Sequence, residues 1–255
     1  MIAMQKHFSD ISFDYDKLRT TDREPILFIK EQLINIPRIV AADIGCGTGR
    51  YSLELLKYFG DRLFLYCVDI NEAMLKQAYK NLREKSKYFN LVNSSANQLS
   101  FNDSFLDAIF TFNAIHHFDL AIFLDQSARV LKKGGYLFIY TRTREQNSRN
   151  IWGNFFPLFN EKEKRLYEIK DLEKEIKKNN NWQIKCIKKF VYKRCSDLDS
   201  LIYKVNNNHY STFSLYSKKE LVQSLYQFED KLSQSFKNLE QIRWNDENVL
   251  IVIKN

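Results

Sequence analysis

A doubly wound α/β fold with a mostly parallel sheet is predicted by three features of the sequence. A short apolar run that begins at Ile39 stops at Asp43 and breaks into alternating glycines, which is typical of a buried strand entering a tight turn. Residues 50–59 follow at once with apolar side chains three positions apart, as expected of a helix that packs on a sheet. Beyond them, strand-like runs alternate with helical patterns of about 10–15 residues, the pattern of parallel sheets.

The remaining elements follow from the same patterns. We expect further strands at residues 63–68, 88–92, 107–113, 136–140, 184–192 and 249–253. Helices are expected after Asn71, at 121–131 and 161–178, and through most of 196–236. Residues 142–157 form an irregular aromatic stretch of the kind found in binding loops and lids.

The chain is long enough for one large catalytic domain with a cap, and no linker or repeat divides it. We expect a single domain over 1–255, with a helical leader at 1–36 and a cofactor-binding core at 38–141. Two insertions, 142–182 and 196–236, are expected to build the cap.

The glycine loop indicates a bound nucleoside cofactor. Without Cβ atoms, Gly45, Gly47 and Gly49 let a ligand approach the backbone, and the following helix start offers N–H groups to an anionic part of it. Asp69 ends the next strand 20 residues after Gly49, where a carboxylate accepts hydrogen bonds from ribose hydroxyls. The dinucleotide fingerprint needs a last glycine where Arg50 stands, which disfavours a nicotinamide oxidoreductase.

Four segments in order resemble one family over roughly residues 38–141. The segments are Asp43-Ile-Gly-Cys-Gly-Thr-Gly49, Val68-Asp69-Ile-Asn, Asn113-Ala-Ile-His-His-Phe118 and Arg129-Val-Leu-Lys-Lys-Gly-Gly-Tyr136. They look like the motifs of class I S-adenosylmethionine-dependent methyltransferases, similar to the ubiquinone and menaquinone biosynthesis type. The resemblance implies a seven-stranded sheet with an antiparallel last strand, and S-adenosylmethionine as cofactor with S-adenosylhomocysteine as product.

The resemblance also implies a set of cofactor-binding residues. They are Gly45, Gly47 and Gly49 with Asp43 and Cys46 at the methionine end, Tyr15 and Arg19 near its carboxylate, Asp69 at the ribose, Ile70 and Met74 on the adenine face, Ser95, Ala96 and Asn97 at the adenine edge, and Asn113 and His116 on the methyl side. Ser95 stands where the family usually has an aspartate facing the adenine amino group. A hydroxyl keeps a hydrogen-bonding group there but loses the charge.

Methyl transfer from a sulfonium needs alignment of the acceptor and exclusion of water, and a base only if the acceptor must first lose a proton. The catalytic candidates are His116, His117 and Tyr210, with His209 nearby in sequence. The alternative for the histidine pair is that one packs under the next helix while the other approaches the cofactor through its backbone. No metal is expected, because the four cysteines show no metal-ligand spacing and are expected to be reduced core residues.

The expected acceptor is a planar or apolar small molecule in a pocket lined by Trp152, Phe155, Phe156, Tyr210 and Tyr216. A tRNA or rRNA methyltransferase is the alternative enzyme, and a cofactor-binding module without catalysis is the alternative from another class. Of the formal net charge of +8, +7 lies from Arg142 onward. That excess could attract RNA or acidic substrates, or form a solvated surface. Nothing in the sequence predicts a signal peptide or a membrane span, so a cytoplasmic protein is expected.

Overall fold

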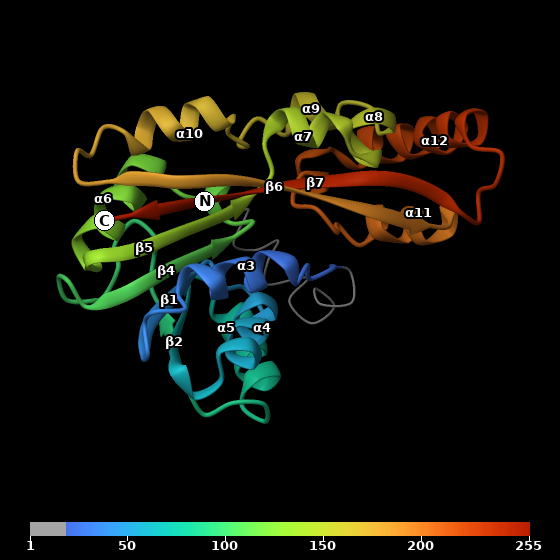
Figure 1. Ribbon diagram of the computed structural model, residues 1–255. Coiled ribbons are helices and arrows are strands. Elements are labelled where there is room, and N and C mark those ends of the chain that lie inside the picture. Colours follow the sequence, from blue (N-terminus) through green and yellow to red (C-terminus); the bar gives the residue numbers. More distant parts are fainter. Residues whose placement is uncertain (1–18) are drawn as a thin grey trace.

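The computed structural model describes residues 19–255. At its centre is a seven-stranded sheet in the order β3-β2-β1-β4-β5-β7-β6 (Figure 1). The strands are β1 (Ile39–Ile44), β2 (Leu63–Asp69), β3 (Phe89–Asn93), β4 (Leu106–Phe112), β5 (Leu131–Thr141), β6 (Gln183–Ser196) and β7 (Ile242–Lys254). Only β7 runs antiparallel to its neighbours, so the predicted doubly wound, mostly parallel sheet with an antiparallel last strand is confirmed.

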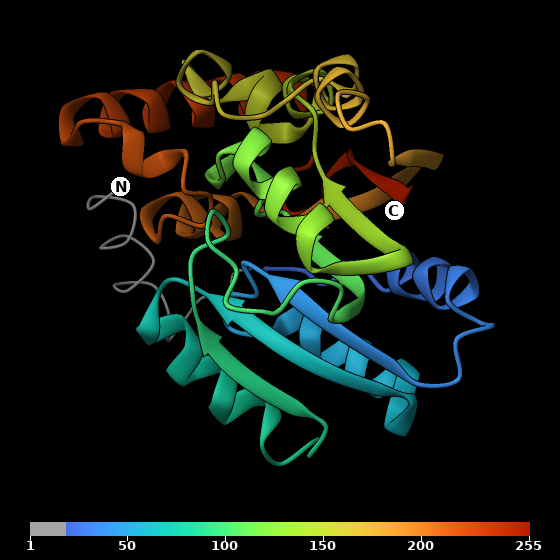
Figure 2. The same ribbon diagram turned by 90° about the vertical axis from the view of Figure 1, so that its left-hand side faces the viewer.

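Helices cover both faces of the sheet (Figure 2). They are α3 (Glu24–Gln32), α4 (Arg50–Phe59), α5 (Glu72–Leu82), α6 (Leu120–Val130), α7 (Arg144–Arg149), α8 (Ile151–Phe155), α9 (Phe159–Lys162), α10 (Ile169–Ile176), α11 (Leu198–Asn206) and α12 (Lys218–Ser235), with short 3₁₀ turns η1 (Gly60–Arg62), η2 (Ile115–His117) and η3 (Phe213–Leu215).

Two core clusters fill the layers between sheet and helices. Because successive strand residues point to opposite faces, Phe138 and Tyr140 of β5 join the cluster under α3 and α4. Leu137 and Ile139 join the cluster under α6 and α10 on the other face. The sheet is thus buried on both sides, which explains its nearly continuous apolar strands.

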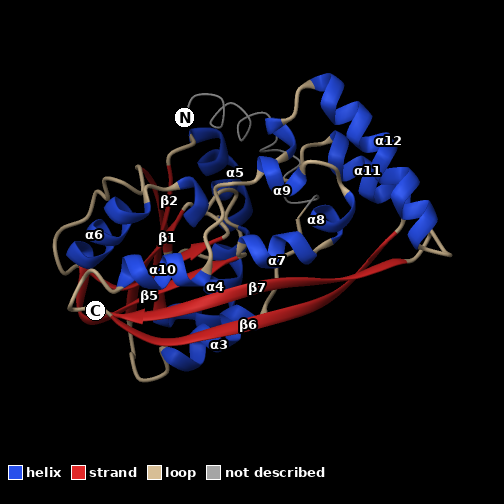
Figure 3. Cartoon of the chain, turned by 90° about the horizontal axis from the view of Figure 1, so that it is seen from above, coloured by secondary structure: helices blue, strands red, loops and turns tan. Residues whose placement is uncertain are grey.

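The β6–β7 pair extends past the rest of the sheet and carries a third cluster. Residues 242–248 of β7 pair with β6 alone, whereas β5 pairs only with residues 249–254. In Figure 3 this two-stranded ribbon reaches the group formed by α7, α8, α9, α11 and α12. We call this group the cap; its core is Ile151, Trp152, Phe156, Phe159, Leu201, Val205, Phe213, Tyr216, Phe228, Leu232 and Ile242.

Several expected boundaries were wrong. The last two strands are longer than predicted, since β6 ends at Ser196 and β7 begins at Ile242. The stretch expected to be irregular, 142–157, forms α7 and α8. The helix expected over 161–178 is interrupted, because the side chain of Glu163 turns inward to accept hydrogen bonds from Arg165 and Thr212. After this break, α10 packs with the second core cluster and lies outside the cap cluster.

The cysteines were expected in the core, but they differ in burial. Cys67 is buried, Cys46 and Cys186 are partly buried, and Cys195 is exposed near the end of β6. Among residues 19–255 no disulfide is present, and no helix there is long and apolar enough to cross a membrane.

We predict that Phe228→Ala destabilises the protein by about 3–5 kcal/mol, because the ring is fully buried in the cap core against Trp152 and Phe156. Tyr226→Ala on the same helix is the control, since that side chain is 69% exposed and its loss should change stability by less than about 0.5 kcal/mol. Urea unfolding of both variants measures this. Equal effects would contradict the assignment of Phe228 to the core.

Candidate active site

The glycine loop connects the end of β1 to the start of α4. The N–H groups of Gly45 and Cys46 donate to the Val68 carbonyl over 2.8 and 3.0 Å, which ties the loop to the end of β2. Gly45 has a φ of +73°, and a Cβ there would lie 2.7 Å from the Cβ of Ala114, so only glycine fits. At Gly47, with φ +56°, a Cβ would meet nothing within 4 Å. Gly47 therefore leaves open the space beside its own backbone.

Asp69 connects the strand end with the loop. Its Oδ2 accepts from the Gly47 N–H over 2.9 Å, and its Oδ1 accepts from the Asn71 N–H over 2.8 Å. A carboxylate has about four acceptor positions, so both oxygens retain capacity for a ligand. Burial raises the pKa of Asp69, while the hydrogen bonds from Asn71 and Gly47 oppose the shift.

Asp43 lies beneath the loop and is 1% exposed. Its Oδ2 accepts from the Ser52 hydroxyl over 2.6 Å. Burial raises the pKa of Asp43 to about 7, against the hydrogen bond from Ser52, and the nearby charge of Asp69 adds to the shift. This carboxyl therefore keeps its proton to a higher pH than an exposed aspartate does.

The next wall of the site comes from the ends of β2 and β3. Ile70 is 45% exposed at the cavity although it is apolar, and Met74 lies beside it. The Ser95 hydroxyl accepts from the Asn97 N–H over 3.2 Å, and Asn97 Oδ1 accepts from the Asp119 N–H over 3.3 Å. The side chain of Ser95 thus shapes the turn on which Ala96 and Asn97 are placed.

The histidine pair follows β4 on η2. Asn113, with φ +53°, donates its N–H to the Tyr140 carbonyl over 2.7 Å and turns the chain toward the cavity. The ring centres of His116 and His117 lie 4.0 Å apart. Burial lowers the pKa of His116 to about 3, with smaller contributions from the charges of Arg165 and Arg19. Burial also lowers the pKa of His117, so both imidazoles are neutral at pH 7.

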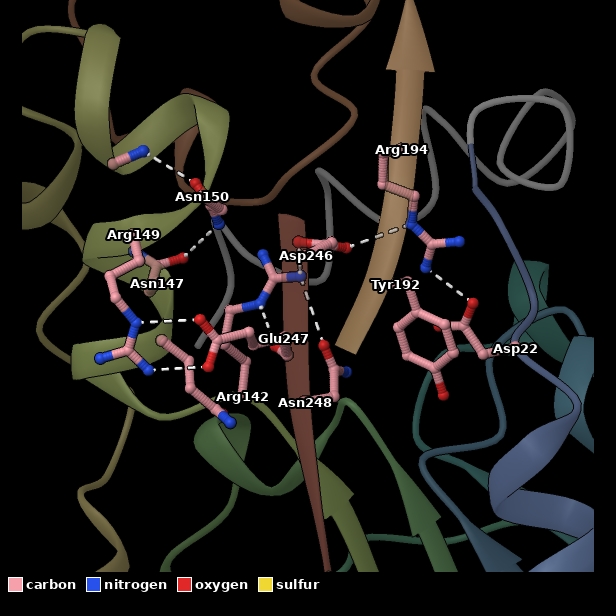
Figure 4. A network of polar contacts seen from close by, with 12 residues as sticks. Asp22, Arg142, Asn147, Arg149, Asn150, Tyr192, Arg194, Asp246, Glu247 and Asn248 are labelled. Carbon is pink, nitrogen blue, oxygen red and sulfur yellow. Dashed lines mark hydrogen bonds and ion pairs between the residues drawn. The ribbon is translucent and has the colours of Figure 1, made fainter. Parts of the chain in front are cut away.

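The opposite wall belongs to the cap and to the long ribbon (Figure 4). Arg142, just after β5, donates to the Tyr210 hydroxyl over 3.2 Å and forms an ion pair with Asp246 on β7. Arg194 on β6 pairs with the other oxygen of Asp246 at 3.6 Å and with Asp22 at 2.6 Å. This chain of ion pairs connects three strands with the segment that precedes α3.

One cavity of about 720 Å³ joins these walls, within the range of about 300–1,000 Å³ that is usual for small-molecule sites. Most of the predicted site residues line it, namely Arg19, Asp43, Gly45, Cys46, Gly47, Asp69, Ile70, Met74, Ser95, Ala96, Asn97, Asn113, His116, His117 and Tyr210. Gly49 lies behind the lining as the N-cap of α4, and Tyr15 lies outside the described residues. Arg19 lies over the Tyr210 ring, 4.6 Å from its centre, on the cap side.

The expected aromatic pocket is largely replaced by polar side chains. Of its five members only Trp152 and Tyr210 line the cavity, whereas Phe155, Phe156 and Tyr216 pack in or against the cap core. The polar side chains on this side of the cavity were not predicted from the sequence, apart from His209, which was a candidate base. They are Arg142, Glu163, Arg165, Arg194, Lys204, Ser211, Thr212 and Asp246. The sequence does give one indication that Arg142 lines the site, because this residue directly follows a parallel strand. Among residues 19–255 no cluster of three or more His, Cys, Asp or Glu could hold a metal.

Comparison with known families tests the resemblance. Residues 42–139 match the family described as Methyltransferase domain, and this range holds the glycine loop, Asp69 and the histidine pair. Residues 42–139 form a methyltransferase domain. For this part of the chain the expected resemblance to class I methyltransferases is thereby confirmed, with S-adenosylmethionine as its cofactor.

Relatives share this domain, and solved structures share the fold over most of the chain. The UbiE C-methyltransferase of ubiquinone and menaquinone biosynthesis from Shewanella halifaxensis is 30% identical over 44% of this chain and 45% of that protein. Probable tRNA methyltransferase 9B from Bos taurus is 32% identical over 49% of this chain and 25% of that protein. The chain thus spans less than half the length of these relatives. The crystal structure of YcgJ from Bacillus subtilis, 18% identical, has a TM-score of 0.63 and covers 92% of this chain and 99% of that one.

The residues of the methyltransferase domain fit such a cofactor. Gly47 leaves room for a ligand against its backbone, and the carboxylate of Asp69 faces the same cavity with acceptor capacity left. Ile70 offers an exposed apolar surface for a planar ring. These three features converge on one wall.

Gly47→Ala should weaken binding of S-adenosylhomocysteine at least tenfold, because the added Cβ enters the ligand space. Gly60→Ala is a matched control, since Gly60 has φ +60° and a Cβ there also meets nothing within 4 Å, but it does not line the cavity. Both variants should lose about 1–2 kcal/mol from the strained backbone. Calorimetry compares the affinities, and equal losses of affinity would contradict the placement of the cofactor.

The raised pKa of Asp43 predicts a pH dependence of stability in the ligand-free protein. The folded state holds a proton that the unfolded chain releases above about pH 4, so this contribution is complete below pH 4 and is lost as the pH rises to about 7. The free energy of unfolding of Asp43→Asn, minus that of wild type, should therefore increase over this pH range by about 1.4 kcal/mol per pH unit. Urea unfolding between pH 4 and 8 measures the difference, and a constant difference would disprove the shift.

Proposed function

We propose that the protein is an S-adenosylmethionine-dependent methyltransferase that acts on a small molecule bound between the methyltransferase domain and the cap. One observation carries this proposal: the glycine loop, Asp69 and the polar wall of the cap line the same cavity. An acceptor held by the cap would thus face a cofactor held by the loop. The cavity has the size of a small-molecule site.

The cofactor supplies an activated methyl group, so the chain's own residues have to position the acceptor and exclude water. His116 lies on the methyl side. A pKa of about 3 makes it a neutral hydrogen-bond partner for the acceptor and a weak base, because proton transfer is most effective with a pKa near the working pH. The Tyr210 hydroxyl lines the cavity and accepts from Arg142, so its own proton remains free to donate to an acceptor molecule. We therefore assign Tyr210 and His116, with His117 beside it, to orientation of the acceptor.

An RNA acceptor is the second candidate, favoured by the similarity to a tRNA methyltransferase and by the lysines of β6, which are Lys185, Lys188, Lys189 and Lys193. However, β6 is the edge strand of the sheet, and lysines on an edge strand also prevent pairing with other chains. The amine of Lys188 lies 3.9 Å from the centre of the Phe28 ring, so part of this charge packs on the protein itself. The enclosed polar cavity therefore favours the small molecule.

The cofactor assignment predicts that S-adenosylhomocysteine binds in calorimetry and NAD does not. Asp69→Ala should weaken binding at least tenfold, since hydrogen bonds to a charged group contribute about 1.5–3 kcal/mol each. Asp125→Ala, which removes an exposed carboxylate from α6, is the control and should bind normally.

Turnover is tested by incubating the purified protein with methyl-labelled cofactor and a cell extract. Label in small molecules is the expected result. Label in material that ribonuclease destroys would favour the RNA alternative. Tight cofactor binding without label in any fraction would favour a binding module without catalysis.

A further inference from the structure

The cap side of the cavity carries an excess of positive charge. The half of the lining formed by residues 141–248 and by the segment before α3 holds five cationic side chains and three carboxylates: Arg19, Arg142, Arg165, Arg194 and Lys204 against Asp22, Glu163 and Asp246. The three carboxylates are all engaged in ion pairs with arginines. The cations on this side of the described lining therefore outnumber its carboxylates by two.

Lys204 of α11 is the clearest case. No carboxylate of residues 19–255 lies within 4 Å of its amine, although the side chain is only partly exposed and lines the cavity. Burial lowers its pKa, and the neighbouring charge of Arg194 acts in the same direction, whereas Asp197 and Asp246 oppose the shift from a distance. A cation withdrawn from water without a close partner is costly, and such groups are typical of binding sites.

His209 lies next to this lysine and supports the same interpretation. The backbone N–H of His209 donates to the backbone carbonyl of Lys204 over 2.9 Å, which keeps the two residues close together. His209 is 8% exposed and lines the cavity, and its Nδ1 is buried without a hydrogen-bond partner among the described residues. A buried polar side chain of this kind normally has a partner, and here the cavity is where one can bind.

The ion pairs of Figure 4 hold the other cations in fixed positions. Arg142 and Arg194 flank Asp246 from neighbouring strands, and each has a second acidic or carbonyl partner. These contacts hold both guanidinium groups in place. Their charge still contributes to the electrostatic potential beside Lys204. The same positive potential acts on His209. Burial is the largest cause of its lowered pKa, and the charges of Arg19, Lys204 and Arg142 lower it further.

We propose that the methyl acceptor is an anionic small molecule whose carboxylate or phosphate group binds against Lys204 and His209. This inference rests on the proposed function and replaces the expectation of an apolar acceptor. The anion supplies the partner that Lys204 lacks, and a neutral imidazole donates to it in the tautomer whose N–H faces the anion. The acceptor atom then lies on the side of His116, where the methyl group is delivered.

Binding of simple anions tests the site independently of turnover. The protein saturated with S-adenosylhomocysteine is titrated with inorganic phosphate and with acetate, against chloride at the same ionic strength, and its melting temperature is followed. We expect an upward shift for at least one anion in wild type and in Lys204→Arg, and none in Lys204→Met. Lys231→Met, which removes an exposed lysine of α12, should behave as wild type. No shift in wild type, or the same shift in Lys204→Met, would overturn the inference.

The labelled-cofactor experiment tests the acceptor itself. We expect the labelled product to be retained on an anion-exchange column at pH 7, with sensitivity to phosphatase distinguishing a phosphate from a carboxylate. Lys204→Met should reduce labelling at least tenfold while affinity for S-adenosylhomocysteine stays unchanged. A neutral or cationic product, or one destroyed by ribonuclease, would refute the anionic small molecule and leave methyl transfer standing. Absence of any label together with anion binding would instead refute the proposed function alone.

Discussion

The hydrogen bond from the Gly47 N–H to the carboxylate of Asp69 is the interaction on which the cofactor site depends. It joins the loop after β1 to the end of β2, so that two motifs 22 residues apart form one wall. The geometry follows from the parallel sheet, in which the carboxyl ends of neighbouring strands meet at one edge. The loop adopts its shape only because Gly45 tolerates both a positive φ and the close approach of Ala114.

The second half of the site depends on the β6–β7 ribbon. Because its outer part leaves the sheet, it carries the cap to the open side of the cofactor edge and places Arg194 and Asp246 over the cavity. The pairs from Arg142 through Asp246 and Arg194 to Asp22 then connect the ribbon to the core. Buried ion pairs of this kind contribute little net stability because desolvation offsets their attraction, and their main effect is to fix position.

The two halves of the cavity differ in character. The cofactor side offers backbone N–H groups, the carboxylate of Asp69 and an apolar surface at Ile70, which suit a nucleoside. The cap side offers cations and the neutral imidazole of His209. The proposed function needs two chemically different ligands side by side in one cavity, and this asymmetry supports it.

The sequence by itself determined the sheet, its crossovers and the cofactor edge, because strand and helix periods and the glycine loop are local patterns of residues 38–141. It also placed Asp69 and His116 on that edge, since Asp69 ends one strand and His116 lies in the turn after another. The cap side was decided only by the tertiary structure. Arg194, Lys204 and Asp246 come from elements whose ends no local pattern marks, and Phe156 and Tyr216 were assigned to a pocket although they form a core. A side chain's aromatic or charged character does not reveal whether it faces a cavity, because that depends on which distant segments pack against it.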